Sequence, residues 1–220
     1  MTGIAERTTT VAPRLAQETP KRVIDVMLSL ALIILAAPLL LLLGLLVRLT
    51  SPGPALFRQE RLGRERQRFI LLKLRTMHTG NDDRIHRDYV TNLLSADPAA
   101  GRSGLFKLDA DPRVTRLGAW LRRTSLDELP QLINVLRGDM SLVGPRPVLP
   151  WEAELFPQPY QQRFAVKPGI TGLWQVSGRS RLAMRQALEL DIEYVLRRSF
   201  AFDLGILLRT VPALFRGGAL

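Results

Sequence analysis

The feature that most constrains this chain is an apolar run at residues 26–47, which contains no charged side chain. As a helix it would be about 33 Å long, which is enough to cross a hydrocarbon core of about 30 Å. A cleaved signal peptide has an apolar core of only about 7–15 residues followed by a small-residue cleavage site. Because the run continues well past Ala36 and Ala37, we expect it to stay on the protein and to enter a membrane.

Two features of this run argue against a simple membrane span. Pro38 cannot donate a hydrogen bond to the carbonyl of residue 34, so the helix should kink or break there. Basic residues also flank both ends, with Lys21 and Arg22 before the run and Arg48 after it. The positive-inside rule therefore places both flanks in the cytoplasm, which a re-entrant hairpin at residues 20–49 satisfies. Proline also occurs in true spans, so the residues alone leave the hairpin and a kinked span equally open.

Charge and composition restrict the partners. The 31 Lys and Arg residues outnumber the 20 Asp and Glu residues and give a net charge of +11, which calls for an anionic partner. With an apolar run present, the anionic cytoplasmic leaflet and phosphorylated substrates are favoured over nucleic acid. A nucleic-acid-binding protein would be expected to show aromatic platforms or a recognition module, whereas only 6% of the residues are aromatic. We therefore predict membrane lipids as partners and no nucleic acid.

The absence of cysteine excludes disulfides, thiolate zinc sites and cysteine nucleophiles. The two histidines are too few for a transition-metal site built from protein ligands alone. If the chain uses a metal, an oxygen-bound ion such as Mg²⁺ is expected.

The rest of the chain predicts an α+β fold. Residues 1–19 lack apolar periodicity and are expected to form a disordered tail. Residues 50–220 would then form the catalytic domain, with a basic amphipathic helix at the C-terminus that lies in the membrane interface; an ordinary helix packed on the domain is the alternative. The expected elements are a β-hairpin at 56–77 with its turn near Gly63, a polar loop at 81–104, helices at 114–123, 132–136 and 180–198, and an irregular segment at 144–150.

Residues 121–147 contain the candidate site. The plainest interpretation of the acid pair Asp127 and Glu128 is a helix start. Ser125 and Glu128 match a capping box, and Asp127 would complement the helix dipole or act as the N-cap itself. Taken alone, such a pair more often begins a helix than performs catalysis.

The arginines nearby point to phosphate chemistry. Arg122, Arg123, Arg137 and Arg146 lie close to the acid pair in sequence, and guanidinium groups bind phosphate oxygens in a bidentate manner. The flanking residues Pro145 and Pro147 would hold Arg146 on a stiff, extended backbone. A carboxylate nucleophile, a second carboxylate for a divalent cation and several phosphate clamps are the parts needed for phosphoryl transfer.

The whole pattern resembles the monotopic phosphoglycosyl transferases, also called bacterial sugar transferases. The motifs that carry the resemblance are "KRVID", the proline-broken run, "SPGPALFRQERLG", "FILLKLRTM", "DPRVTRLGAWLRRTSLDELPQLINVLRGDMSLVGPRP" and "VKPGITGLWQVSGRS". The resemblance runs from residue 21 to about residue 210. The resemblance implies a monotopic protein whose re-entrant helix turns at Pro38, with small sheets, a helical catalytic core and interfacial amphipathic helices. Ala37 stands where family members often have serine.

The resemblance also implies the reaction. Asp127 would attack the β-phosphorus of a UDP-sugar, release UMP and form a covalent phosphosugar-aspartyl enzyme, which undecaprenyl phosphate would then attack. Glu128 would bind Mg²⁺. The other implied site positions are Arg122 and Arg146 as phosphate contacts, Arg179 in nucleotide recognition, and Lys73 in the strand motif.

The same resemblance implies a place and a pathway. The protein would lie in the bacterial cytoplasmic membrane, with its catalytic domain on the cytoplasmic face. It looks most like the small members that initiate exopolysaccharide synthesis with galactose or glucose 1-phosphate. An N-acetylated or modified sugar, and a non-catalytic scaffold for glycan assembly, are the alternatives. A homodimer and contacts with downstream glycosyltransferases also remain open.

Overall fold

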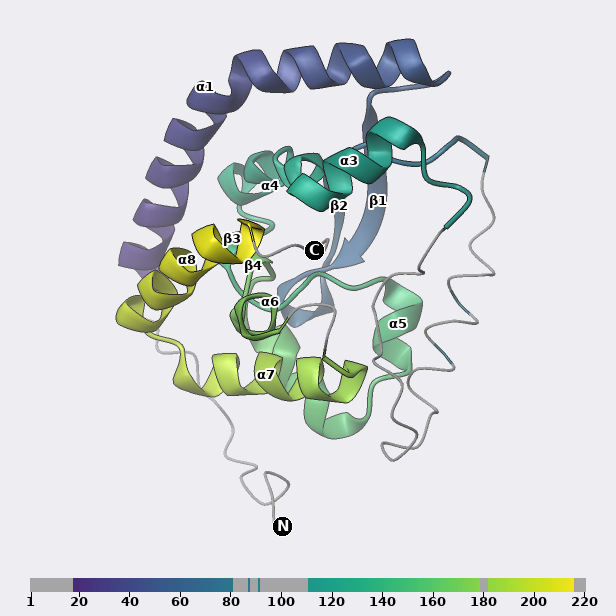
Figure 1. The fold of residues 1–220 in the computed structure, drawn as a ribbon. Helices are drawn as coiled ribbons and strands as arrows, with labels where there is room; N and C mark the ends of the chain where they lie inside the picture. The colour runs from purple at the N-terminus through teal and green to yellow at the C-terminus, as the bar shows by residue number, and fades with distance from the viewer. Residues whose placement is uncertain (1–17, 81–86, 88–90, 92–110, 179–181, 216–220) are drawn as a thin grey trace.

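The computed structural model describes residues 18–80, 87, 91, 111–178 and 182–215. Most of the expected tail and loop 81–104 lie outside the described residues. The described part combines helices with two small sheets, which confirms the α+β prediction. Figure 1 shows the long N-terminal helix α1, Glu18–Thr50, lying along the outside of the other elements.

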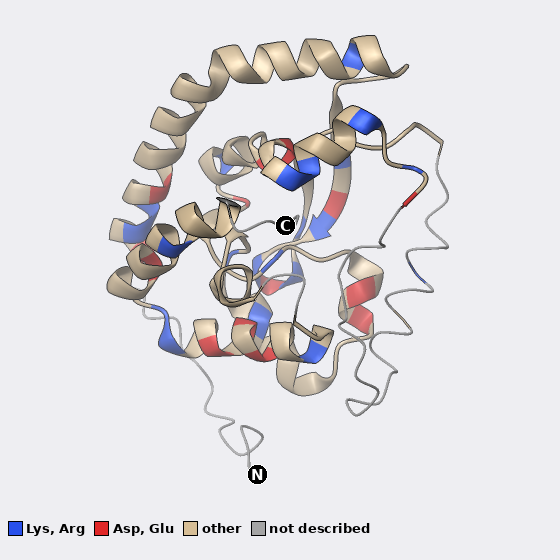
Figure 2. Cartoon of the chain, viewed as in Figure 1, with Lys and Arg blue, Asp and Glu red and all other residues tan. Residues whose placement is uncertain are grey.

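Helix α1 is continuous through Pro38, and its ribbon bends near the middle (Figure 1). The chain therefore has one bent helix where the sequence predicted a kink or a break. Within the described residues it is the one helix with the length and hydropathy to cross a membrane, and only 11% of its most apolar window is buried. Leu35 and Leu41 are 78% and 77% exposed. Figure 2 shows that most of α1 is free of charge. An exposed apolar surface of this extent is compatible with a monotopic membrane protein.

The first turns of α1 are fastened to the domain by polar contacts. The Lys21 ammonium donates to the Asp203 carboxylate at 2.5 Å, and the Asp25 carboxylate accepts from the Leu142 amide at 3.1 Å. The Arg22 guanidinium donates to the carbonyls of Val135 and Leu136 at 2.5 and 2.8 Å. Since these carbonyls end a helix, Arg22 supplies the cation that a helix C-terminus attracts.

The last turns of α1 contact the same domain. Leu43 and Val47 are buried against Leu74 and Leu121. The buried Arg75 guanidinium donates to the carbonyl of Ser51 at 2.7 Å, just beyond the end of α1. Both ends of the helix are therefore held by one folded body.

The predicted hairpin is confirmed. Strands β1, Leu56–Leu62, and β2, Arg68–Leu74, pair in antiparallel register from Leu56↔Leu74 to Leu62↔Arg68, and the short helix η3, Arg64–Arg66, follows Gly63 at the turn.

Helix α4, Gln131–Arg137, ends at Gly138, whose φ of 94° confirms the predicted glycine stop. The fully buried Asn134 fastens α4 to β2: its Oδ1 accepts from the Leu72 amide at 3.0 Å and its Nδ2 donates to the Ile70 carbonyl at 2.7 Å.

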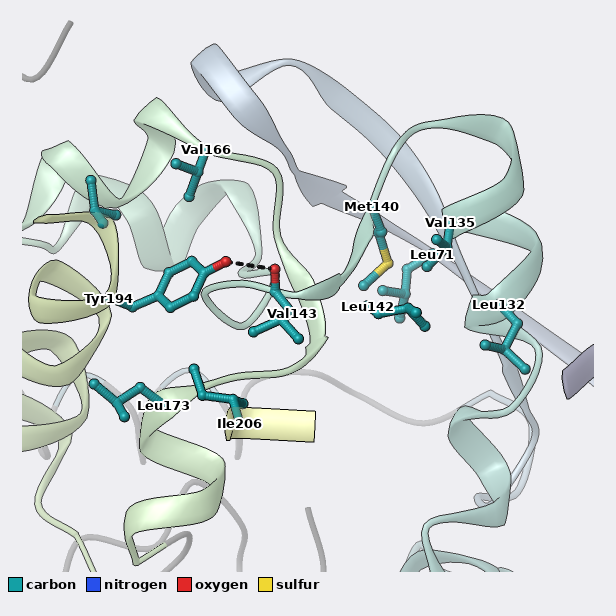
Figure 3. Packing of buried hydrophobic residues seen from close by; sticks show 11 residues of the cluster. Leu71, Leu132, Val135, Met140, Leu142, Val143, Val166, Leu173, Tyr194 and Ile206 are labelled. Carbon is teal, nitrogen blue, oxygen red and sulfur yellow. Dashed lines mark hydrogen bonds between the residues drawn. The ribbon is translucent and has the colours of Figure 1, made fainter. Parts of the chain in front are cut away.

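The remaining elements build the core that carries the site. Strands β3 and β4 pair in parallel, and the main apolar cluster lies around them, where the Tyr194 hydroxyl donates to the Val143 carbonyl (Figure 3). The expected helices at 114–123 and 180–198 are confirmed with shifted ends. The bounds are α3 Arg116–Thr124, η5 Leu126–Glu128, β3 Ser141–Val143, α5 Pro150–Glu154, η6 Gln158–Ala165, β4 Gly169–Thr171, α6 Leu173–Ser177, α7 Met184–Arg197 and α8 Phe200–Phe215.

Helix α8 has features of both predicted alternatives, an ordinary helix packed on the domain and an amphipathic helix with an exposed apolar side. Asp203 and Ile206 are buried against the domain, as in an ordinary packed helix. Leu208 and Val211 are 66% and 58% exposed on the outside. The helix therefore packs on the domain and still offers an apolar surface.

Candidate active site

The acid pair lies on a short turn between two helices. Ser125 ends α3 in the left-handed region with φ 58°, and its amide donates to the Leu121 carbonyl. Asp127 and Glu128 follow in η5, and both are buried with 6% exposure. The predicted capping box is wrong, because the Ser125 side chain makes no capping bond and Pro130 occupies the N-cap position of α4. The serine of a capping box has an extended backbone, whereas the backbone of Ser125 is left-handed.

A cleft of about 930 Å³ opens beside this turn. Asp127, Lys73, Arg122 and Arg146 all line it, so residues from a strand, a helix, a turn and a loop meet there. Glu128 lines a small adjoining cavity together with Lys73 and Arg146. The structure thus brings together five of the six predicted site residues, while Arg179 lies outside the described residues.

Lys73 connects the strand motif to the acid pair. Its ammonium donates to Glu128 Oε1 at 3.0 Å, and the two side chains are 19% and 8% exposed. The register of the hairpin places Lys73 opposite Phe57, near the end of β2. This ion pair compensates the buried charge of Glu128, which would otherwise be costly to keep out of water.

Arg122 projects from α3 into the same cleft. Its Nε donates to Thr76 Oγ1 at 3.0 Å. Burial lowers the pKa of the Arg122 guanidinium, and the negative charge of Asp127 opposes that change. Arginine still remains a cation at neutral pH, so Arg122 offers positive charge next to Asp127.

The loop that carries Arg146 is held at three successive carbonyls. The Pro145 carbonyl accepts from the Gly169 amide at 2.8 Å, and the Arg146 carbonyl accepts from Arg163 Nη2 at 2.7 Å. The Pro147 carbonyl accepts from Arg61 Nη1 at 3.3 Å. Gly169 is required here, because a Cβ on it would come within 2.1 Å of the Gly144 amide nitrogen. The expected stiff backbone at Arg146 is therefore reinforced by partners from three other parts of the chain.

The sequence interpretation did not assign to the site several other basic side chains that line the cleft, and Arg61 and Arg113 are two of them. Arg113 forms a two-bond pair with Asp111, at 2.9 and 2.8 Å, which lowers the pKa of that carboxyl group. Both arginines lie within motifs of the resemblance, but neither is close in sequence to the acid pair; the strand pairing and the loop before α3 bring them to the cleft. Arg123 and Arg137, grouped with the site by proximity in sequence, are exposed and are not among the residues that line it.

The residues present suit a hard divalent cation held in part by substrate. Among the described residues, no group of three or more His, Cys, Asp or Glu side chains forms a protein-only cage. Mg²⁺ usually binds through one or two carboxylates, several waters and substrate phosphates. Glu128, paired with Lys73 and next to the cleft that Arg122 and Arg146 line, offers one carboxylate of the kind that binds Mg²⁺.

Comparison with known proteins gives consistent matches. A family model described as bacterial sugar transferase matches residues 16–217. The UDP-glucose:undecaprenyl-phosphate glucose-1-phosphate transferase of Caulobacter vibrioides is 46% identical over 211 residues, which cover 92% of this chain and 72% of that protein. Exopolysaccharide production protein ExoY of Sinorhizobium fredii is 39% identical over 220 residues and 95% of each chain. The undecaprenyl-phosphate galactose phosphotransferase of Salmonella typhimurium is 39% identical over 89% of this chain and 40% of its own length.

Proposed function

Because this chain belongs to the bacterial sugar transferase family, we propose that it transfers a hexose 1-phosphate from a UDP-sugar to undecaprenyl phosphate. The observation that carries the proposal is the cleft in which the buried Asp127 lies among Arg122, Arg146 and Lys73. Such a site combines a fixed carboxylate with several phosphate-binding cations, as phosphoryl transfer requires.

The proposed reaction has two steps at one carboxylate. An Asp127 oxygen attacks the β-phosphorus of the donor, the bond from that phosphorus to the bridging oxygen breaks, and UMP leaves with the oxygen. A phosphate oxygen of undecaprenyl phosphate then attacks the same phosphorus and releases the Asp127 carboxylate. Arg122 and Arg146 stabilise the charge on the transferring group. A covalent intermediate lets one soluble and one lipid substrate use the site in turn.

Glu128 is the residue that would hold Mg²⁺ in this scheme, together with oxygens of the donor phosphates. When bound, the ion would neutralise phosphate charge as the UMP oxygen leaves. Lys73 keeps the Glu128 carboxylate oriented through the bond at 3.0 Å.

The membrane geometry forms part of the proposal. We place α1 in one leaflet, entering and leaving on the cytoplasmic face, with the exposed apolar side of α8 in the interface. One observation supports this placement: both ends of α1 contact the same domain, whereas a span would put those ends on opposite faces. The cleft then lies close to the membrane surface, where the phosphate of the lipid acceptor is found.

Glucose and galactose are the sugars we propose, because relatives named for each match nearly the whole of this chain. A panel of UDP-sugars scored by UMP release would identify the donor, and it would detect an N-acetylated or modified sugar as well. The scaffold alternative is disfavoured, since both acids are present and buried in the site. It would be supported only if no donor gave UMP.

Replacing Asp127 tests the nucleophile. We expect Asp127→Asn to lower the rate of UMP release by at least about a thousandfold, because an amide is a poor nucleophile. Intact-mass measurement after incubation with donor alone should find a sugar-phosphate adduct on the wild-type chain and none on the variant. Glu193→Gln, which removes a half-buried acid of α7 that pairs with Arg197 and lies outside the cleft, is the control and should keep both rate and adduct. Near-normal turnover by Asp127→Asn would rule out the assignment.

A further inference from the structure

Beneath the Arg146 loop lies a buried ion pair that the reaction scheme does not use. Arg163 of η6 and Asp191 of α7 are joined by Nη2 and Oδ2 at 2.7 Å. Their side chains are only 3% and 4% exposed. Burying two charges is expensive, and replacing such a pair by apolar residues is often neutral or stabilising, so stability alone is a weak explanation for it.

The same nitrogen of Arg163 makes a second contact. Nη2 donates one hydrogen to Asp191 and the other to the Arg146 carbonyl, again at 2.7 Å. The Arg163 guanidinium also lies over the rings of Phe156 and Phe164, at 5.1 and 5.8 Å from their centroids. These contacts fix the guanidinium plane, so the hydrogen that points at the Arg146 carbonyl has a defined direction.

We infer that Asp191 and Arg163 are positioning residues for Arg146. By orienting Arg163, the buried Asp191 carboxylate raises the affinity of the Arg146 side chain for the donor diphosphate. The inference rests on the proposed function, because it takes Arg146 to be a phosphate contact. A carboxylate below the loop orients Arg163, Arg163 holds the loop carbonyl, and the Arg146 side chain projects into the cleft. Neither residue touches the cleft itself, since neither is among the residues that line it.

The charge of Asp191 gives this arrangement a pH dependence. Burial raises the pKa of Asp191 to about 6, while the positive charges of Arg163 and Arg146 act in the opposite direction. Among the described residues, Arg163 and Arg146 are the charged groups that act on Asp191. Of the elements packed on α7, η6 carries no charged side chain besides Arg163 and α6 carries none, while Asp203 of α8 is bonded to Tyr194 and Lys21. Above this pKa the carboxylate holds Arg163. Below this pKa the carboxyl group is neutral, so its ion pair with Arg163 is lost and Arg163 is held less firmly against the Arg146 carbonyl.

Donor kinetics of the full-length chain in lipid nanodiscs test the inference. With UDP-glucose and UDP-galactose as donors, we expect Asp191→Asn to raise the donor KM about tenfold at pH 7.5 and to change kcat less than threefold. The wild-type donor KM should rise as the pH falls below about 6. The donor diphosphate keeps its charge in this range, so titration of the donor would not explain the rise. The donor KM of the Asp191→Asn variant should stay constant from pH 5 to 8. Asp191→Glu, which restores the carboxylate, should recover part of the affinity and the pH dependence.

Asp203→Asn is the matched control, because Asp203 is also a buried acid in an ion pair, but its bonds go to Lys21 and Tyr194 and not to Arg163. Its donor KM should stay within twofold of wild type. An equal rise in both variants, or an unchanged KM in Asp191→Asn, would overturn the inference. If Asp191→Asn does not fold, a wild-type KM that is flat from pH 5 to 8 overturns it.

Equilibrium binding separates this inference from the proposed function. In an Asp127→Asn background the donor stays intact, so calorimetry reports its dissociation constant without turnover. Asp191→Asn should weaken UDP-glucose binding about tenfold there, and an unchanged constant would contradict the positioning role. Absence of UMP release from the wild-type chain with every donor would instead contradict the proposed function.

Discussion

Ser125 has a φ of 58° and lies two residues before Asp127. A non-glycine residue in this region costs about 1–2 kcal/mol. Its hydroxyl is buried, and among the described atoms it has no hydrogen-bond partner. The Ser125 side chain therefore forms no hydrogen bond that compensates the strain, which occurs where the chain turns from α3 into the acid pair.

A glycine at this position should relieve the strain. We expect Ser125→Gly to raise the free energy of unfolding by about 0.5 kcal/mol, because glycine adopts positive φ freely but loses more entropy on folding. Ser125→Val should lower it by about 2 kcal/mol, since a β-branched side chain is disfavoured there. Denaturant unfolding of the detergent-solubilised chain, followed by tryptophan fluorescence, measures both. Thr124→Gly, inside α3, is the control and should destabilise; stabilisation there as well would mean that backbone strain at 125 is not the cause.

At the level of residues, the sequence indicated the members of the site that are close to one another along the chain. Asp127, Glu128, Arg122 and Arg146 lie within one block of residues, and three of them line the main cleft. Arg61 could not be found in this way, because strand pairing and a bond to the Pro147 carbonyl bring it there. The capping-box interpretation failed because the spacing of Ser125 and Glu128 does not reveal a left-handed backbone.

Asn134 links helix α4 to the hairpin in place of a third strand. The amide of Leu72 and the carbonyl of Ile70 point to the same edge of β2, and the Asn134 side chain satisfies both. A buried backbone group left without a partner costs about 1–3 kcal/mol. The position of the acid pair depends on this link, because only two residues separate Glu128 from the start of α4, and Lys73 follows Leu72.

Replacement by leucine tests the link. We expect Asn134→Leu, which leaves both β2 groups unpaired, to lower the free energy of unfolding by about 3 kcal/mol. Thermal unfolding of the purified chain should show a clear fall in Tm. Ile133→Leu on the same helix keeps an apolar side chain of equal volume and should cost less than about 1.5 kcal/mol. If the two variants unfold alike, the side-chain bonds of Asn134 do not hold α4 on the strand.

Helices and strands whose apolar residues repeat at a regular spacing were predictable from the sequence, but the way these elements pack on one another was not. Apolar spacing and turn residues located the hairpin, α3 and α7, and Gly138 marked the end of α4. The parallel pair β3 and β4 was missed because each strand has only three residues, too few to show a period. For α1 the apolar run predicted the helix, but only the contacts of its two ends show which surfaces it touches.

At the scale of the whole molecule, the basic residues at the start of α1 have a second use. The sequence analysis interprets Lys21 and Arg22 as cytoplasmic flanks of the apolar run. In the structure both side chains also bind partners in the domain. Arg75 holds the far end of the helix in the same way. A straight span would have to break one of these two sets of contacts, so fold and membrane topology are coupled in this chain.

Cysteine accessibility tests that topology directly, because the chain has no native cysteine. Thr19 and Thr50 lie at the two ends of α1 and are both exposed. We expect Thr19→Cys and Thr50→Cys to react with a membrane-impermeant maleimide in inverted vesicles and to stay unmodified in spheroplasts. Leu35 is 78% exposed on the protein surface, and in the proposed placement lipid covers it. Leu35→Cys should therefore react only after detergent is added. Each variant should keep its UMP release, which verifies that the labelled chains are folded. Modification of the two end positions from opposite sides would mean that α1 crosses the bilayer. The placement of α1 in a single leaflet would then be wrong.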